Sequence, residues 1–337
     1  MIGDDAPFAF AVSGAFAGCD PRIPEEDPAC HGVLDRADHL RGDPDALTAL
    51  WPQGRVVLLD PDGNALADAD DTLFAPSGEQ VSGGPGGIGA AIFLGLDVNG
   101  IGWFALDAAL AALDAPGRLD LRSAAARWPA FDTGVFGQAR ALQHWRHRHR
   151  HCGVCGGTVE FCRGGWLGRC GGCGIEHYPR TDPAVIVAVT DGERLLLGRQ
   201  STWAPRRYSV VAGFVEPGES LEQTVAREVL EETSVRVRGC RYLGSQPWPF
   251  PGQLMLGFIA IADPDEPRVD DELEDARWFS AEEIRAARAR DIDDDGGPLL
   301  SSPISIASWL IDQWLLALGQ SATADRAGAG KADISTR

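Results

Sequence analysis

Short apolar runs separated by turn residues predict β-strands in two parts of the chain. In the first part, turn signals such as Pro61-Asp62-Gly63 follow the runs, which cover 55–60, 90–97 and 102–106. In the second part, Asp191-Gly192 reads as a hairpin turn, and the runs cover 184–189, 194–198, 208–213 and 254–261. Each part is therefore expected to form a sheet.

Helical patterns accompany both sets of strands. A helical stretch is predicted over 121–145, and a last helix over 304–318. Ser280 stands where a helix beginning at Ala281 needs an N-cap. The tail, 319–337, is rich in Ala, Gly and Ser and is predicted to be disordered. This mixture of elements predicts an α+β protein, and 337 residues are enough for two domains.

One predicted helix carries a concentration of carboxylates. Glu228, Glu231 and Glu232 stand at i, i+3 and i+4, so they share one side of the helix. Like charges this close repel, so a cation is expected among them, and hard oxygen ligands suit Mg²⁺ or Mn²⁺. The alternative is an ordinary amphipathic helix with a solvated Glu face. The adjoining flank of the helix is apolar and consists of Leu221, Val225 and Val229.

The residues around this helix complete a longer pattern. Arg227 can pair with Glu219 and orient the preceding loop, while Gly213 and Gly218 are expected to permit its tight bends. The pattern resembles the Nudix box, the signature of hydrolases that cleave a nucleoside diphosphate linked to another group. One position departs from it, because Ser234 stands where that family usually has Gly. The change affects the helix end but removes no ligand.

A second compact motif consists of four cysteines. Cys152 and Cys155 form one C-x2-C pair, and Cys170 and Cys173 form another. Four thiolates at this spacing are typical of a tetrahedral Zn²⁺ site, which we expect to be structural and closed to water. The remaining cysteines have no such pairing and are interpreted as bystanders; they are Cys19, Cys30, Cys162 and Cys240.

The formal net charge of -19 disfavours a nucleic-acid scaffold, because such a field repels polyanions. The first residues, 1–5, lack a basic signal-peptide region, and no run is long and apolar enough to span a bilayer. With cysteines in a metal-type pattern, these features predict a cytoplasmic protein in a reducing compartment and no membrane partner.

A basic strip, 144–151, precedes the cysteine motif and alternates His with Arg after Trp145. As a functional element it could attract phosphate or hold a spare metal ion. We favour the solvated end of a helix that enters the cysteine element.

The segment Ser245 to Pro251 reads SQPWPFP. Its three prolines restrict the backbone and hold Trp248 and Phe250 in fixed directions, which suits an aromatic-lined pocket. A Pro-rich turn that plugs hydrophobic surface is the alternative. With the upstream box, the segment resembles the signature of the NADH pyrophosphatase branch of the Nudix superfamily. The segment 178–183 and the cysteine motif resemble two further features of that branch, and the ordered match covers about 145–315.

The resemblance implies hydrolysis of the pyrophosphate of NADH or NAD⁺ to nicotinamide mononucleotide and AMP. A close variant of this activity accepts NAD-capped RNA ends, since the same bond is broken. The resemblance also implies a homodimer. Two alternatives stay open: a Nudix hydrolase for ADP-ribose or another nucleoside diphosphate, and a nucleotide sensor that has lost the chemistry.

The resemblance further implies a set of site residues. Glu228, Glu232 and Glu272 would be metal ligands together with the Ala212 carbonyl, with Glu231 close by. Either Glu231 or Glu232 could accept the proton of the attacking water. Tyr178 and Phe214 would stack on a planar base. The dinucleotide pocket would be lined by Gln246, Pro247, Trp248, Pro249, Phe250, Pro251, Gln253 and Ala307, with Gln253 standing where the family often has Ser.

These patterns, together with the resemblance to the Nudix superfamily, predict four segments. Residues 1–145 form a mixed α+β accessory domain that is Nudix-like, and 146–178 form a zinc ribbon. Residues 179–318 form the catalytic Nudix domain, an α/β/α sandwich with a mixed sheet, and 319–337 form the tail.

Overall fold

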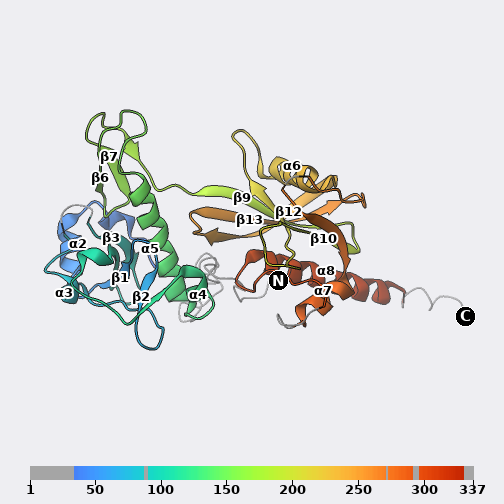
Figure 1. Ribbon diagram of the computed structural model, residues 1–337, viewed down its shortest axis with the longest axis horizontal. Coiled ribbons are helices and arrows are strands. Elements are labelled where there is room, and N and C mark those ends of the chain that lie inside the picture. Colours follow the sequence, from blue (N-terminus) through green and yellow to red (C-terminus); the bar gives the residue numbers. More distant parts are fainter. Residues whose placement is uncertain (1–33, 87–89, 271, 291–295, 330–337) are drawn as a thin grey trace, which may run out of the picture. The chain divides into compact units, whose positions relative to one another are not determined.

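The computed structural model describes residues 34–86, 90–270, 272–290 and 296–329 (Figure 1). The chain divides into two compact units, residues 1–181 with 247–253 and residues 182–246 with 254–337. Part of the SQPWPFP segment therefore belongs to the first unit, although strands of the second unit flank it in the sequence.

The first unit contains a five-stranded sheet in the order β3-β4-β1-β2-β5. β1 and β4 run parallel, whereas β1–β2, β2–β5 and β3–β4 are antiparallel. The strands are β1 (Arg55–Leu59), β2 (Ala65–Ala67), β3 (Ile92–Leu96), β4 (Gly102–Asp107) and β5 (Gly117–Leu119). The helices are η2 (Asp38–Leu40), α2 (Pro44–Leu50), α3 (Gly78–Val81), η3 (Ala108–Leu110), α4 (Leu121–Ala125) and α5 (Ala130–Arg148).

Both faces of this sheet are covered, which explains the continuous apolar runs of its central strands. Val56 and Leu58 of β1 pack in one hydrophobic cluster with Trp51, next to α2. Val57 and Leu59 point to the other face, in a cluster with residues of α4 and α5. The predicted strands at 55–60, 90–97 and 102–106 are confirmed as β1, β3 and β4.

The helix predicted over 121–145 is instead two helices. α4 ends at Ala125, and α5 begins after Pro129, which has an extended backbone (φ -52°, ψ 150°). Proline disfavours the helical conformation in the residue before it, so the chain cannot continue as one helix through Trp128.

The cysteine element forms a small antiparallel sheet of three strands within the first unit. Its order is β6-β7-β8, with Val159 paired to Cys170 and Cys162 paired to Leu167. The strands are β6 (Val159–Cys162), β7 (Leu167–Cys170) and β8 (Glu176–His177).

The second unit contains a six-stranded sheet in the order β12-β13-β9-β10-β14, and β11 pairs antiparallel with β9. The strands are β9 (Asp182–Thr190), β10 (Arg194–Arg199), β11 (Val211–Phe214), β12 (Val237–Trp248), β13 (Gln253–Ala262) and β14 (Asp275–Ser280). The helices are α6 (Leu221–Thr233), α7 (Ala281–Arg288) and α8 (Ile306–Ala329). The four strands predicted in this part are confirmed as β9, β10, β11 and β13.

Helices α6 and α8 lie on opposite faces of this sheet (Figure 1). Val185 and Val187 of β9 share a hydrophobic cluster with Val225 and Val229 of α6. On the other face, the indole N–H of Trp314 in α8 donates to the Thr190 hydroxyl at 3.0 Å. The α+β class and the layered second domain are therefore confirmed.

Two helix ends bear on the predictions. Ser280 caps α7 as predicted, because its side chain accepts from the Glu283 N–H and the Glu283 carboxylate accepts from the Ser280 N–H. α8 continues past the predicted end at Leu318 to Ala329, so residues 319–329 of the tail that was predicted to be disordered are helical, and 330–337 lie outside the described residues. In the parts of the chain that the structure describes, no helix combines the length and the apolar character that crossing a bilayer requires.

Candidate active site

A short loop between β11 and α6 carries the chain into the carboxylate helix. Gly218 adopts φ 96°, a left-handed conformation that glycine accepts at little cost. Ser220 then caps α6, since its hydroxyl accepts from the Gln223 N–H and the Gln223 side chain accepts from the Ser220 N–H. The predicted helix and the bend before it are thus both present.

Gly213 is required for a different reason from the one predicted. It lies in β11 and does not form a bend, but the Glu228 carboxylate packs against its Cα. A Cβ at this position would lie 1.8 Å from the Glu228 Cδ, far inside van der Waals contact. Only glycine therefore leaves room for that carboxylate beside the strand.

Arg227 joins the loop to the helix. Its Nε and Nη2 donate to the two Glu219 oxygens at 2.6 and 3.0 Å, and Nη2 also donates to the Phe214 carbonyl at 2.9 Å. Nη1 donates to Glu228 and to Glu231, both at 3.0 Å. The bidentate pair with Arg227 lowers the pKa of Glu219 to about 2, and Glu219 in turn raises the pKa of Arg227.

Glu228 and Glu232 are the buried members of the carboxylate group, each with 8% of its surface exposed. Burial, then the charges of Glu228 and Glu272, raises the pKa of Glu232 to about 8. Burial also raises the pKa of Glu228, opposed by its hydrogen bond from Arg227. Since the Glu272 charge acts on both groups, this exposed loop residue lies near the helix.

Crowded, partly desolvated carboxylates of this kind fit a divalent cation, which would offset their mutual repulsion. Glu231 differs from its neighbours, because 61% of its side chain is exposed and Arg227 binds it. Ala212 stands in β11 directly opposite Ile186 of β9, one residue before Gly213. Its carbonyl therefore belongs to the strand on which Glu228 rests.

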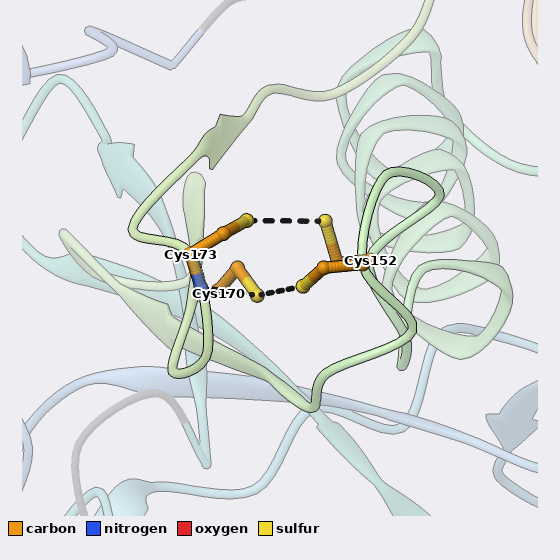
Figure 2. Close-up of side chains that lie close together, drawn as sticks. Cys152, Cys170 and Cys173 are labelled. Carbon is orange, nitrogen blue, oxygen red and sulfur yellow. Dashed lines mark hydrogen bonds between the residues drawn. The ribbon is translucent and has the colours of Figure 1, made fainter.

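The four predicted thiols form a cluster, and Figure 2 shows Cys152, Cys170 and Cys173 of this group. All four Sγ atoms lie within 4.8 Å of one another, with Cys152–Cys173 at 3.7 Å and Cys155–Cys170 at 3.4 Å. Tetrahedral zinc with Zn–S bonds near 2.3 Å places sulfurs about 3.8 Å apart, so the spacing fits this ion.

Backbone groups already face these sulfurs. The N–H groups of Val154, Gly172 and Cys173 point at the Sγ atoms of Cys152 and Cys170 at 3.3–3.4 Å. The Cys173 N–H, with further bonds from Cys155 and Gly172, lowers the pKa of Cys170 to about 6. The pKa of Cys173 rises to about 12 despite a bond from the Ile175 N–H, because the neighbouring thiols oppose its ionisation. Four thiolates at this spacing need a cation.

The segment Pro247 to Gln253 packs within the first unit. Phe250 is partly buried against the hydrophobic cluster of that unit's sheet. The guanidinium of Arg122 lies 4.3 Å from the Phe250 ring centroid and 5.3 Å from that of Trp248. Arg140 stacks at 5.5 Å from the Phe250 centroid and donates to the Pro249 carbonyl.

Sequence reasoning did not find Arg122 and Arg140, because nothing in their local spacing relates them to a segment more than a hundred residues away. Gln253 contributes to the same segment. In the amide orientation that satisfies its contacts, it donates to the carbonyls of Phe250 and Trp248 at 2.9 and 3.0 Å. These two hydrogen bonds connect Gln253 to the turn. The family that the sequence resembles often has the shorter Ser at this position.

The strand β12 extends to Trp248, so Pro247 lies in a strand and not in a turn. This is compatible with proline because β12 is an edge strand of its sheet. Gln246 and Ala307 are buried, with 0% and 1% exposure, and their place in the dinucleotide pocket stays a prediction. The Gln246 amide is used internally, because it donates to the Ile304 carbonyl and accepts from the Ile306 N–H, both at 2.8 Å.

The two predicted stacking residues lie in different units. Tyr178 belongs to the first unit, is 64% exposed, and donates to Glu176 at 2.6 Å. Phe214 belongs to the second unit and is 54% exposed at the end of β11. Exposed aromatic rings of this size are available for contact with a planar ligand.

Known proteins show the same features over most of the chain. The model of the NUDIX domain matches residues 180–299. The NAD-capped RNA hydrolase NudC of Mycobacterium bovis BCG is 39% identical over 290 residues, which cover 83% of this chain and 92% of that protein. The chain belongs to the Nudix family, in its NudC branch.

Two further NudC-branch relatives match shorter regions. The NAD-capped RNA hydrolase NudC of Stutzerimonas stutzeri is 43% identical over 182 residues, covering 54% of this chain and 61% of its own. The NAD-capped RNA hydrolase NUDT12 of Macaca fascicularis is 42% identical over 164 residues, covering 45% of this chain and 36% of its own. The family resemblance inferred from the carboxylate helix, the SQPWPFP segment and the cysteines is confirmed.

Proposed function

We propose that this NudC-branch protein hydrolyses the pyrophosphate bond of NADH or NAD⁺ and also acts on NAD-capped RNA 5′ ends. The observation that carries the proposal is the buried pair Glu228 and Glu232, of which Glu228 lies beside Gly213 and accepts a hydrogen bond from Arg227. The names of the relatives support the choice of substrate. An inactive nucleotide sensor would have no need of crowded buried carboxylates, whose desolvation costs stability.

Glu228, Glu232, Glu272 and the Ala212 carbonyl would hold Mg²⁺ or Mn²⁺, since oxygen donors suit both ions. When bound, such a cation neutralises the pyrophosphate and polarises its phosphoryl oxygens. The protein contributes the orientation. Arg227 fixes Glu228 and anchors Glu219 of the preceding loop, so the carboxylates keep their positions when the substrate arrives.

The reaction adds water across one P–O–P linkage. The water oxygen attacks one phosphorus, the bridging oxygen leaves with the other, and nicotinamide mononucleotide and AMP result with release of a proton. Either Glu231 or Glu232 would accept that proton. The Glu231 side chain is 61% exposed, whereas Glu232 is buried and its burial raises its pKa to about 8.

We further propose that the accessory domain fixes the segment 247–253 for substrate recognition, with Tyr178 and Phe214 as stacking residues. Arg122 lies over the Trp248 ring and Arg140 over the Phe250 ring. In this proposal Arg140→Met raises KM for NADH about tenfold, with kcat nearly unchanged, because the loop loses one hydrogen bond and one cation–π contact. Arg118→Met, which removes an exposed ion pair with Asp114, is the matched control.

The decisive experiment is a metal-dependent assay of the purified full-length chain with NADH and with ADP-ribose, with products identified. Mononucleotide and AMP from NADH, at a higher kcat/KM than for ADP-ribose, support the proposal. Faster cleavage of ADP-ribose would replace it with the ADP-ribose alternative, and no turnover of either substrate, with intact binding, would indicate a sensor.

NAD-capped and triphosphorylated versions of one short RNA test the RNA activity. Selective decapping of the first supports the proposal. The net charge of -19 opposes general RNA affinity, so we expect capture of the cap and little dependence on RNA length. We also propose that the protein is a homodimer, lies in the cytoplasm and holds a structural zinc ion at the four cysteines. Light scattering of the purified chain tests the homodimer.

A further inference from the structure

The first unit contains a cavity that is separate from the carboxylate helix. Its volume is about 150 Å³, and it lies where the parallel strands β1 and β4 end, beside the paired residues Leu59 and Asp107. In sheets with parallel strands, the carboxyl ends of the strands form the crevice in which ligands commonly bind. The position in the fold therefore favours a binding site.

The basic strip at the end of α5 supplies the polar wall of this cavity. Arg146, His147 and Arg150 line it, together with Gln143 and Asp107. The Asp107 carboxylate is already engaged, because it accepts from Gln143 Nε2 at 2.6 Å and lies 3.1 Å from His147 Nε2. The wall thus carries two guanidinium groups and one carboxylate, and each oxygen of that carboxylate already has a protein partner. The wall therefore attracts an anion even though the whole chain carries a charge of -19.

The Arg146 guanidinium is held in place by its surroundings. It lies 4.9 Å from the Phe161 ring centroid and donates to the Ala90 carbonyl at 3.3 Å. Burial lowers the pKa of Arg146 from its usual value, with Asp107 acting in the opposite direction. An orientation fixed in advance reduces the entropy lost when a ligand binds.

The rest of the cavity is apolar. Leu59 and Ala105 are each 1% exposed, Ile92 is 3% exposed, and Phe161 adds an aromatic surface. A cavity of about 150 Å³ lined by apolar side chains is large enough for one benzene ring. Cations near the C-terminus of a helix also stabilise its dipole, but that role requires neither the cavity nor the Gln143–Asp107 pair.

We propose that this cavity binds a small monocarboxylate with a single apolar ring, the carboxylate facing Arg146 and Arg150 and the ring lying against the apolar floor. A monoanion is favoured over a dianion because Asp107 lies on the same wall. The inference goes beyond the proposed function and does not depend on it, since every lining residue belongs to the first unit.

The test uses the full-length, zinc-loaded chain without added Mg²⁺ and ligand-observed ¹⁹F NMR. The probe is 4-fluorobenzoate, and 4-fluorobenzamide is the neutral probe of the same shape. We expect the carboxylate to bind at least about tenfold more tightly than the amide, because charge-assisted hydrogen bonds to arginine are lost in the amide. Affinity for the carboxylate should also fall as salt is added.

Variants locate the binding. Arg150→Gln should weaken 4-fluorobenzoate binding about tenfold. Arg148 is an exposed residue of the same strip that does not line the cavity, and Arg148→Gln should change the affinity for 4-fluorobenzoate by no more than about twofold. Glu232→Gln should bind the probe like the unmodified chain, which separates this result from any failure of the proposed hydrolysis. Equal affinity for both probes, no binding of either, or equal losses in the two arginine variants overturns the proposal.

Discussion

The cysteine cluster and the carboxylate cluster both consist of candidate metal ligands from short sequence motifs. They differ in how far their ligand groups are exposed to solvent. The four Sγ atoms lie within 4.8 Å of one another, and backbone N–H groups point at two of them. The carboxylates instead combine two buried groups, Glu228 and Glu232, with Glu231 and Glu272 at the surface.

On the roles proposed above, this difference separates a structural site from a reactive one. Four thiolates complete a tetrahedral shell and leave no place for a substrate. A half-exposed set of carboxylates leaves one side of a cation open to water and phosphate. The two clusters should therefore respond in opposite ways to the loss of one ligand, the first in stability and the second in activity.

The largest effect is expected for Glu232→Gln. It should reduce kcat for NADH by on the order of 10³, because it removes the buried carboxylate that is proposed to hold the metal and to accept the proton. Without added metal, the variant should be at least as stable as the unmodified protein, since one repelling buried carboxylate is gone. Steady-state kinetics and thermal unfolding measure both quantities. Glu222→Gln, on an exposed position of the same helix, is the control, and activity within about threefold of normal in Glu232→Gln would falsify the metal assignment.

Loss of a cysteine ligand should act on stability. Cys173→Ser is expected to lower the free energy of unfolding by about 3 kcal/mol or more, because metal binding is coupled to folding of the ribbon. Zinc content and the denaturant midpoint should fall together, while the kcat of the molecules that remain folded stays near normal. Cys162→Ser, outside the cluster in β6, is the control and should retain its zinc. A stable, zinc-free Cys173→Ser protein would contradict the structural role.

Gly213→Ala tests the contact between the strand and the carboxylate helix. Its new Cβ would overlap Glu228, so the carboxylate must move, and we expect kcat/KM to fall about 10²-fold. The free energy of unfolding should also fall, by about 1–3 kcal/mol. Gly239→Ala in β12, where a Cβ meets nothing within 4 Å, is the matched control. Equal kinetics in the two variants would show that Glu228 need not rest on the strand.

Ser234→Gly should have the smallest effect. Ser234 ends α6 with φ 58° and ψ 15°, a left-handed conformation that glycine adopts more readily than serine. Relief of this strain stabilises the folded chain, and the larger entropy of glycine in the unfolded chain offsets part of that gain. We expect a net increase of about 0.5–1 kcal/mol in the free energy of unfolding, with unchanged activity. Thermal unfolding measures it. Ser234→Ala, which keeps a Cβ, should show no such gain, and an equal gain in both variants would point to another cause.

The sequence by itself determined the parts of both clusters whose geometry is local. The i, i+3 and i+4 spacing placed Glu228, Glu231 and Glu232 together through the helical repeat, and the paired C-x2-C spacing predicted the cysteine cluster. The strands were predictable because both sheets are covered on two faces, which makes their central strands continuously apolar.

Only the tertiary structure decided the contacts between distant segments. The sequence predicted that Gly213 permits a bend, whereas the structure shows that this glycine leaves room for the Glu228 carboxylate. Gln246 accepts a hydrogen bond from the Ile306 N–H at the start of α8, which lies 60 residues further along the chain. Phe250 packs against the core of the first unit, and Arg122 and Arg140 contact its ring. Helix periodicity and ligand spacing are encoded within a few residues, whereas these contacts depend on how whole sheets and helices pack, and no local pattern records that packing.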